Sequence, residues 1–296
     1  RDIFHEITCR SEDVLQTETE INKGTRLVVV TSASGGVGKT TAAMGLAAVL
    51  STNYKRVLYI STDPLQTFRH MLRNRTPISE NDIYTELMHA DDTVYGKIRH
   101  GVRKEQFSYL PPLKAPLISL GICGDVFVKI AESAKRTGEF DYILLDADCS
   151  FDENKMTLLE LADQVLFVTG QNAASIEATN ILVENINGID REKFIFLGND
   201  FVPETDNVRG APQIPRTQIP QISKVLQVSQ ELQISREPQT SQVPQISREP
   251  QMLQEPQVLQ KFEISEYVEH FDQYDQMGCA DFAEQASLRR AAYLLK

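Results

Sequence analysis

Cysteine is scarce in this sequence. Only four occur among the 296 residues, at positions 9, 123, 149 and 279, and they are scattered along the chain. No two of them have the spacing of a metal-binding pair. This usage argues against a cysteine-ligated metal site and indicates a reduced, cytosolic setting.

Long apolar runs and an excess of positive charge are also missing. No apolar run approaches the ~18 residues that a transmembrane helix needs, and no signal peptide is visible. Thirty Lys and Arg stand against 41 Asp and Glu, a formal net charge of −11. This balance disfavours non-specific binding of the whole chain to nucleic acid or to an anionic membrane, while it leaves a local basic patch open. The ordinary apolar content of 41% suits one large globular core.

The most informative stretch is residues 27–50, LVVVTSASGGVGKTTAAMGLAAVL. It begins with an apolar, β-branched run, Leu27 to Val30, which is typical of a strand buried on both faces. A glycine-rich turn and Lys39-Thr40-Thr41 follow, and the alanine-rich segment after them predicts a buried helix. Strand, glycine loop, Lys-Thr and helix in this order indicate a phosphate-binding loop. A plain glycine-rich turn between strand and helix is the alternative.

Each residue type in this loop has a chemical use. Glycines carry no Cβ, so consecutive backbone amides can approach phosphate oxygens, and the start of the helix adds its unpaired amides and its positive dipole end. Lys39 can place its ammonium on the β- and γ-phosphates, and the Thr40 hydroxyl can coordinate Mg²⁺. The predicted nucleotide-binding residues of the loop are Ser34, Gly35, Gly36, Val37, Gly38, Lys39, Thr40 and Thr41.

Carboxylates follow two further predicted strands. Residues 56–60 predict a strand, and Asp63 lies just past its carboxyl end, where open α/β sheets bind ligands. A turn-forming Asp before a proline is the alternative. Residues 140–146 predict a strand that ends in Asp146, a Walker B-like carboxylate that can hold Mg²⁺ through a water molecule. The alternative is a core strand that ends in Asp by chance.

The remaining pattern predicts an α/β fold of the P-loop NTPase class, with a mostly parallel sheet and helices on both faces. Further strands are predicted at 107–110, 162–169 and 194–198, and helices at 125–137, 175–187, 267–274 and 282–295. Residues 113–120 are predicted to form a loop. We expect the final helix to pack on the sheet, because it has few bulky apolar residues with which to enter a membrane.

Residues 206–260 differ in composition from the rest. Pro, Gln, Ser and isolated aliphatic residues dominate, and Ile-Ser-Arg-Glu-Pro-Gln occurs at 234–239 and again at 246–251. Prolines remove backbone donors and single aliphatics cannot build a core, so this stretch predicts a disordered insertion. A short-period β-solenoid is the structured alternative. The insertion could serve as a tether or docking segment, or be a tolerated repeat expansion.

The domain boundaries follow from this shift. We expect an ATPase-like domain at 26–205 and 261–296, interrupted by the insertion. Residues 1–25 are polar with one short apolar pattern, which predicts a linker or arm. The alternative is that they are the end of a preceding domain.

The loop departs from the common pattern G-x-x-x-x-G-K-S/T, because Ala33 stands where the first glycine would be. Its S-G-G-V-G-K-T-T instead resembles the deviant loop K-G-G-x-G-K-S/T-T of the MinD/ParA family of P-loop ATPases. In that family a lysine at the place of Ser34 reaches the partner's ATP in a nucleotide-sandwiched homodimer. The resemblance therefore implies ATP binding with slow hydrolysis, since Ser34 cannot supply that cation.

The resemblance also assigns roles to single residues. It implies catalytic roles for Lys39 and Asp63, a magnesium site at Thr40, Asp63 and Asp146, and a contact of Asn199 with the adenine base. Asp63 matches the second carboxylate of the family's D-x-D, whose first position is Ser61 here. The implied cofactors are ATP and Mg²⁺.

Within this family, the loop without the lysine looks most like the CpaE/TadZ proteins of Flp/Tad pilus assembly. Those proteins carry a receiver-like domain before the ATPase domain, which would explain a chain that begins at Arg1 rather than at Met. The likeness implies a nucleotide-dependent homodimer and partners in pilus assembly or polar localisation. It also implies a cytoplasmic protein that is recruited to the inner face of the membrane or to a cell pole.

Other functions stay open at this point. A non-hydrolysing nucleotide-binding scaffold would keep the same loop and carboxylates. A ParA-like partition ATPase would need a basic surface for DNA, which the acidic balance disfavours. A bacterial tyrosine autokinase shares the loop type, but Tyr267, Tyr274 and Tyr293 are too dispersed for its C-terminal tyrosine cluster.

Overall fold

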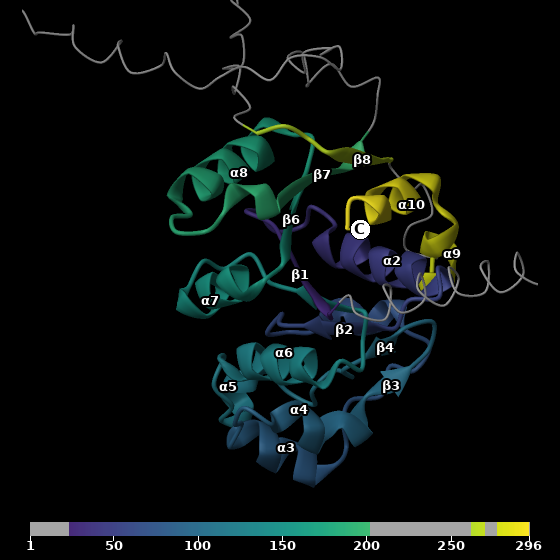
Figure 1. Cartoon of the computed structure of the whole chain (residues 1–296), viewed down its shortest axis with the longest axis vertical. Helices are drawn as coiled ribbons and strands as arrows, with labels where there is room; N and C mark the ends of the chain where they lie inside the picture. The colour runs from purple at the N-terminus through teal and green to yellow at the C-terminus, as the bar shows by residue number, and fades with distance from the viewer. Residues whose placement is uncertain (1–23, 202–261, 270–276, 296) are drawn as a thin grey trace, which may run out of the picture. The chain divides into compact units, whose positions relative to one another are not determined.

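The computed structural model describes residues 24–201, 262–269 and 277–295. Within them one sheet has the strand order β3-β4-β2-β5-β1-β6-β7-β8 (Figure 1). Only β3 runs antiparallel to its neighbour among the described strands, so the mostly parallel sheet is confirmed. The strands are β1 Arg26–Thr31, β2 Val57–Ser61, β3 Arg103–Lys104, β4 Ser108–Tyr109, β5 Tyr142–Asp146, β6 Gln164–Thr169, β7 Phe194–Phe201 and β8 Glu266–Glu269.

Helices cover both faces of the sheet, as predicted. On one face lie α2 Lys39–Thr52, α9 Cys279–Glu284, α10 Ala286–Tyr293 and the 3-10 helix η1 Thr67–Met71. On the other lie α3 Asn81–Met88, α4 Val94–Ile98, α5 Leu117–Leu120, α6 Val126–Thr137 and α7 Glu153–Leu161, with α8 Ala173–Asn185 beside them (Figure 1). Two short 3-10 turns, Arg99–Gly101 and Arg191–Lys193, complete the described elements.

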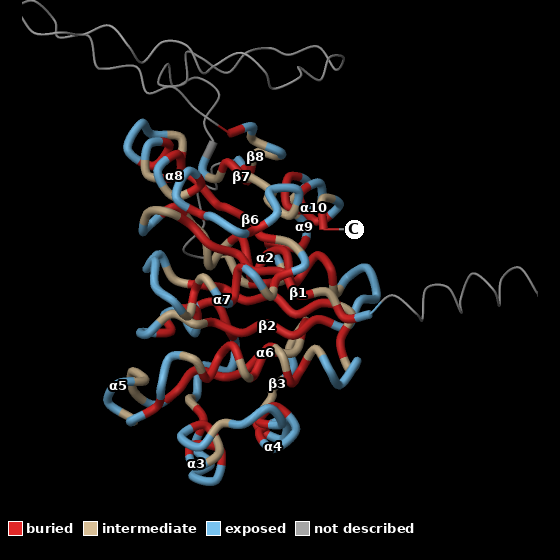
Figure 2. Tube along the Cα trace, turned by 60° about the vertical axis from the view of Figure 1, so that its left-hand side comes forward, coloured by how far each residue is buried: buried red, intermediate tan, exposed pale blue. Residues whose placement is uncertain are grey.

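The alternation of side chains along the strands builds a core on each face. In β1, Leu27 and Val29 belong to one hydrophobic cluster, and Val28 and Val30 to the other. All of them have no exposed surface. Figure 2 shows the central strands buried, with the exposed residues in the outer helices, the turns and the strands at the edges of the sheet. A strand flanked by neighbours and covered on both faces needs apolar residues at every position, which is why this stretch reads as a continuous apolar run.

Parallel register brings the carboxyl ends of the central strands to one edge of the sheet. Asp146 at the end of β5 lies opposite Val30 of β1 and opposite Ser61 of β2. The loop that follows β1 and the turn that follows β2 therefore meet beside Asp146. This is the edge at which open parallel sheets bind ligands.

The C-terminal part differs from its sequence-based prediction. Residues 266–269 lie in strand β8 rather than in a helix over 267–274, because they pair in parallel with β7 and bury Val268 against the sheet. The predicted helix 282–295 is two helices, since Gln285 between α9 and α10 has an extended backbone (φ −69°, ψ 126°). Both helices pack against α2, and the expected burial of their apolar face within the fold is confirmed.

Two shorter segments were also mispredicted or missed. The predicted loop 113–120 contains the single helical turn α5, which Gly121 ends with a left-handed backbone (φ 68°). Helix α7 had no prediction at all, since its polar and apolar residues do not separate into two faces. Its start is fixed by Asp152, whose carboxylate accepts from the Lys155 amide.

Parts of the predicted domain plan cannot be compared with the fold. Nearly all of the arm 1–25 and the whole insertion 206–260, with its two repeats, lie outside the described residues. The plan therefore stays a prediction there. In the described part of the chain, no helix combines the length and the apolar character that crossing a bilayer requires.

Candidate phosphate-binding site

The turn between β1 and α2 depends on two glycines with left-handed backbones, Gly36 (φ 76°) and Gly38 (φ 79°). Gly38 caps the amino end of α2, which begins at Lys39. A Cβ atom on Gly38 would lie 2.2 Å from Nδ2 of Asn199, whereas the space around Gly36 is open. Gly38 is thus required both by its backbone conformation and by the close approach of another side chain.

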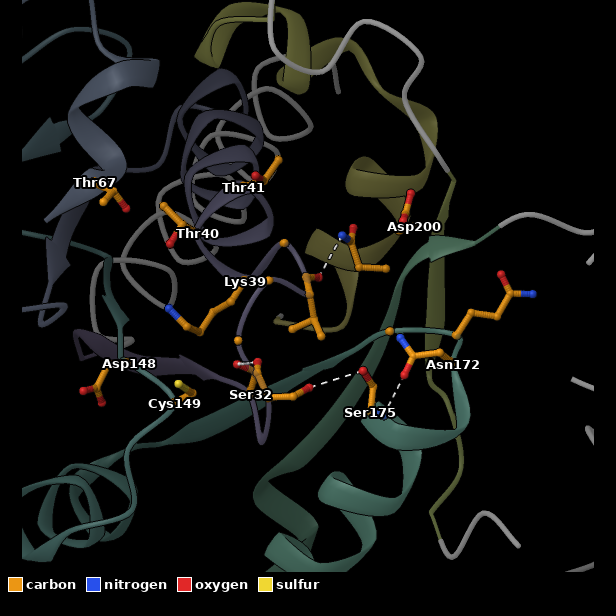
Figure 3. Close-up of a pocket in the computed structure, with 18 of the residues that line it drawn as sticks. Ser32, Lys39, Thr40, Thr41, Thr67, Asp148, Cys149, Asn172, Ser175 and Asp200 are labelled. Atoms are coloured by element: carbon orange, nitrogen blue, oxygen red, sulfur yellow. Dashed lines mark hydrogen bonds between the residues drawn. The ribbon is translucent and has the colours of Figure 1, made fainter. Parts of the chain in front are cut away.

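The loop borders a cavity of about 810 Å³ at the carboxyl edge of the sheet (Figure 3). Every predicted nucleotide-binding residue lines it, and so does Asp63. The wall also includes residues outside the predicted set of site residues. These are Ser32, Thr67, His70, Asp148, Cys149, Gly170, Gln171, Asn172, Ser175, Asp200 and Glu269. A cavity of this size suits a small-molecule ligand, for which typical pockets have ~300–1,000 Å³.

Asp146 is the centre of a buried hydrogen-bond network beneath the loop. Its Oδ1 accepts from Lys39 Nζ over 2.8 Å. Its Oδ2 accepts from the Thr40 hydroxyl and from the Tyr59 hydroxyl, each over 2.8 Å. The carboxylate has no exposed surface, so these three donors replace the water that it loses on folding. The structure thus brings together Lys39, Thr40 and Asp146, as the sequence predicted.

Tyr59 is the member of this network that sequence reasoning missed. It lies in β2 with its side chain fully buried, and burial raises the pKa of its phenol well above the usual value, with the charge of Asp146 adding to the rise. The phenol therefore stays protonated and can only donate to the carboxylate. The sequence does contain a signal for Tyr59. It is a hydroxyl-bearing residue within an otherwise aliphatic strand, two residues before Ser61.

Ser34 is directed toward its own chain. Its hydroxyl lies 3.3 Å from the Ser175 hydroxyl in the first turn of α8, where Asn172 caps the helix by accepting from the Ser175 amide. Figure 3 shows Ser175 and Asn172 on one side of the loop, with Asp148 and Cys149 on the other. The start of α8 thus forms a wall of the cavity that contains serine and asparagine rather than a cation.

Asp63 and Asn199, the two predicted lining residues that lie outside the loop, also line the cavity. Asp63 Oδ1 accepts from the Leu65 amide over 3.0 Å, so Asp63 forms the turn that was the alternative interpretation while it also faces the cavity. Asn199 donates from Nδ2 to the Val37 carbonyl over 3.0 Å. Asn199 therefore holds the loop in place through Nδ2. Its other polar atom, Oδ1, is an acceptor on the residue that was predicted to contact adenine.

Lys155 in the first turn of α7 is a second cation near the loop. Only 4% of its surface is exposed, and its ammonium donates to the Asp148 carbonyl. Burial, together with the charge of Lys39, lowers its pKa to about 8 against the opposing effect of Asp148. Nothing in its spacing within the sequence pointed to this position.

The donor set can be compared with the needs of Mg²⁺. Within the described ranges, no group of three or more His, Cys, Asp or Glu side chains could hold a metal ion. Mg²⁺ commonly takes one or two carboxylates and completes its octahedron with water and phosphate oxygens. The Thr40 hydroxyl beside the Asp146 carboxylate fits that requirement, provided that a phosphate is bound in the loop.

A glycine loop between a central parallel strand and a helix, with a carboxylate at the end of the neighbouring strand, defines a P-loop nucleotide-binding protein of the α/β class. A family model described as an AAA domain matches residues 25–197, which is more than half of the chain. The chain belongs to this family.

Individual proteins and one solved structure are similar to this chain. A putative arsenical pump-driving ATPase 2 of Aquifex aeolicus is 34% identical over 125 residues, which cover 38% of this chain and 42% of that protein. The septum site-determining protein MinD of Bacillus subtilis is 26% identical over 164 residues, covering 53% and 57%. The crystal structure of the cell division ATPase MinD of Pyrococcus furiosus covers 62% of this chain and 74% of that one, with 19% identity and a TM-score of 0.49.

The family model and the curated MinD relative place the chain with the ATP-binding P-loop ATPases of the MinD/ParA type, which confirms that part of the resemblance. The chain spans about half the length of the two curated relatives. The finer likeness to pilus-assembly proteins stays a prediction.

Proposed function

We propose that this protein binds ATP with Mg²⁺ in the cavity and acts as a nucleotide-dependent switch that localises or assembles a partner, with slow ATP hydrolysis. One observation carries the proposal: Lys39, Thr40 and the fully buried Asp146 meet at 2.8 Å beneath the loop, at the edge of the cavity. Burying a carboxylate with a lysine costs desolvation free energy, so such a pair contributes little to stability. Buried charged groups of this kind are typical of functional sites.

The parts of the ligand have matching residues in the chain. Backbone amides of residues 34–41 would surround the phosphates, and Lys39 would exchange its bond to Asp146 for the β- and γ-phosphate oxygens. Thr40, Asp146 and Asp63 would hold Mg²⁺ directly or through water. When bound, the ion would offset charge on the phosphate oxygens. Asn199 is the proposed contact to the adenine base, because it lines the same cavity.

Slow turnover follows from the residues around the γ-phosphate. Lys39 and Asp63 are the proposed catalytic residues, the first stabilising charge and the second orienting water. Ser34 contributes no positive charge and bonds to Ser175 of its own chain. Catalysis of phosphoryl transfer depends chiefly on positioned positive charge, so a site with fewer cations is expected to hydrolyse ATP slowly.

A switch needs a surface that changes with the ligand. The turn after Asp63 lines the cavity on one side and exposes 72% of Leu65 on the other. Occupancy by the γ-phosphate would fix this turn and favour a homodimer or another partner. Flp/Tad pilus assembly, with recruitment to the membrane face or a cell pole, is the finer version, and it rests on the S-G-G-V-G-K-T-T loop alone.

The test measures ATP turnover together with molar mass by light scattering, without nucleotide, with ADP and with ATP, each with Mg²⁺. Lys39→Ala is the test variant. Lys97→Ala is its matched control, because Lys97 is ion-paired on the exposed side of α4 with Glu86 and Asp91. We expect slow turnover and ATP-dependent dimers in the wild type and in Lys97→Ala, and neither in Lys39→Ala.

The other outcomes separate the alternatives. Tight ATP binding with no turnover would identify a nucleotide-binding scaffold. ATP-dependent binding to DNA would favour a ParA-like partition ATPase. The absence of any effect of nucleotide on mass, stability or turnover would contradict the proposal as a whole.

A further inference from the structure

We propose that Lys155 supplies a second positive charge to the phosphate site, acting from behind the Asp148–Cys149 wall of the cavity. The inference rests on the proposed function, because the anion in question is the triphosphate of the bound nucleotide. Lys155 would strengthen binding of the anion, and its buried charge would cost stability when no anion is bound.

The first argument is the environment of the ammonium. Lys155 is 4% exposed, and its Nζ donates to a carbonyl oxygen, that of Asp148. Within the described part of the chain it forms no ion pair, unlike Lys39, which contacts Asp146. A buried ammonium whose hydrogen-bond acceptor is neutral is expensive. The nearby charge of Asp148 offsets this cost only in part, because burial still lowers the pKa of Lys155.

The second argument is its place on the helix. Lys155 lies in the first turn of α7, three residues after the capping Asp152. Backbone amides point out of this end of a helix, so a positive charge here is repelled by the helix dipole. An apolar side chain of the same length would avoid both costs. Groups held in unfavourable electrostatic surroundings are typical of functional sites.

The third argument is what lies between the ammonium and the cavity. Asp148 and Cys149 line the cavity, and Lys155 bonds to the carbonyl of the first of them. The hydroxyl of Thr31, at the end of β1 just before the loop, approaches the same carbonyl at 3.4 Å. Burial lowers the pKa of Lys155, and the charge of Lys39 acts in the same direction against the opposing charge of Asp148. A triphosphate in the loop would offset both ammonium charges at once.

This arrangement explains how the loop could function with serine at position 34. Ser34 and the start of α8 provide only neutral hydroxyl and amide groups on their side of the loop. Lys155 adds a cation from the opposite side, near the end of β5. The positive charge of the site would then come from α7 of the same chain and not from a partner subunit.

A purely structural role makes the opposite prediction. If Lys155 only secured the Asp148 carbonyl, replacing it would destabilise the nucleotide-free protein and leave anion affinity nearly unchanged. If it serves the anion, Lys155→Met should leave the nucleotide-free protein as stable as the wild type or more stable, and should weaken anion binding. The two measurements thus move in different directions under the two roles.

The experiment uses the full chain and two probes, tripolyphosphate alone and ATP with Mg²⁺, followed by calorimetry and thermal unfolding. We expect Lys155→Met to bind each probe about tenfold more weakly, because the attraction of one nearby positive charge is lost, and Lys155→Arg to recover most of the loss. Lys129→Met is the matched control, since Lys129 is ion-paired to Asp125 on α6. It should change neither affinity.

Each other outcome counts against the inference. Unchanged affinity in Lys155→Met, or a Lys155→Met protein that is markedly less stable or does not fold, would show a structural lysine. Wild-type protein that binds neither probe would contradict the proposed nucleotide site itself. If the wild type binds the probes and Lys155→Met binds them with the same affinity, only the role of Lys155 would be contradicted.

Discussion

The Tyr59 hydroxyl in β2 donates to Oδ2 of Asp146 at the end of β5, over 2.8 Å within the core. Of the three donors to this carboxylate, Tyr59 is the one that does not belong to the phosphate loop. When Lys39 and Thr40 turn to a ligand, Tyr59 can therefore keep its bond. It holds the orientation of Asp146 independently of what occupies the cavity.

Removing that hydroxyl should affect both stability and the magnesium requirement. We expect Tyr59→Phe to lower the free energy of unfolding by about 1–2 kcal/mol, because one donor to a buried carboxylate is lost. It should also raise the Mg²⁺ concentration needed for half-maximal ATP binding. Tyr142→Phe is the control, since Tyr142 is likewise buried but donates to the Leu295 carbonyl. An equal shift in the Mg²⁺ requirement for both variants would contradict a specific role of Tyr59.

Gly36 and Gly38 both have left-handed backbones, and comparing substitutions at the two positions distinguishes backbone strain from steric crowding. Alanine at either position costs about 1–2 kcal/mol in backbone energy. Only at Gly38 would the new Cβ also meet Asn199, at 2.2 Å. We therefore expect Gly38→Ala to lose ATP affinity more severely than Gly36→Ala. Because Asn199 is also the proposed adenine contact, Asn199→Ala serves as the reference background: Gly38→Ala should cost less ATP affinity there than in the wild type. An equal cost in both backgrounds would mean that the clash is not the cause.

The C-terminal helices should behave as part of the core. Leu288 on α10 is 1% exposed and lies so close to α2 that a Cβ on Gly45 would be 2.7 Å from its Cδ1. Leu288→Ala should lower the free energy of unfolding by about 3 kcal/mol in denaturant titrations. Leu65→Ala, at a leucine that is 72% exposed, should change it by less than about 0.5 kcal/mol. Similar values for the two would contradict the packing of α10 on α2.

The environment of Lys155 predicts a pH dependence with a definite sign. Burial lowers its pKa from 10.5 to about 8, with Lys39 lowering it and Asp148, Cys149 and Asp152 opposing the shift. The unfolded chain therefore binds more protons between these two values, and the contribution of Lys155 to stability rises with pH across that window. Below pH 8 its charge destabilises the fold in full.

Binding of an anion should cause Lys155 to take up a proton. At about pH 8.5 part of Lys155 is neutral, and a bound triphosphate would favour its charged form. Calorimetry of ATP binding in two buffers of different ionisation enthalpy should thus show net proton uptake in the wild type and none in Lys155→Met. Cys149→Ser should retain the uptake, which excludes the neighbouring thiol as its source. Equal uptake in the wild type and Lys155→Met would contradict the prediction.

Much of the site could be predicted from the sequence because its parts are local. Gly35 to Thr41 form a contiguous loop whose chemistry depends on residue types and their order. Asp146 ends an apolar strand that can be recognised without knowing its neighbours. The stretch that became β8 was mispredicted because four residues take their conformation from pairing with β7, a partner distant in sequence.

By itself, the sequence determined the phosphate loop, its α/β setting, the Walker B-like carboxylate and the MinD/ParA type of the chain. These features follow from short runs in which apolar character, glycine and charge have fixed spacing. Only the tertiary structure decided that Tyr59 shares Asp146 with the loop, that Ser34 turns to Ser175, and that Lys155 is buried beside Asp148. Each of these depends on which strands pair and on which side chains lose water on folding, and those properties arise only between segments far apart in the chain.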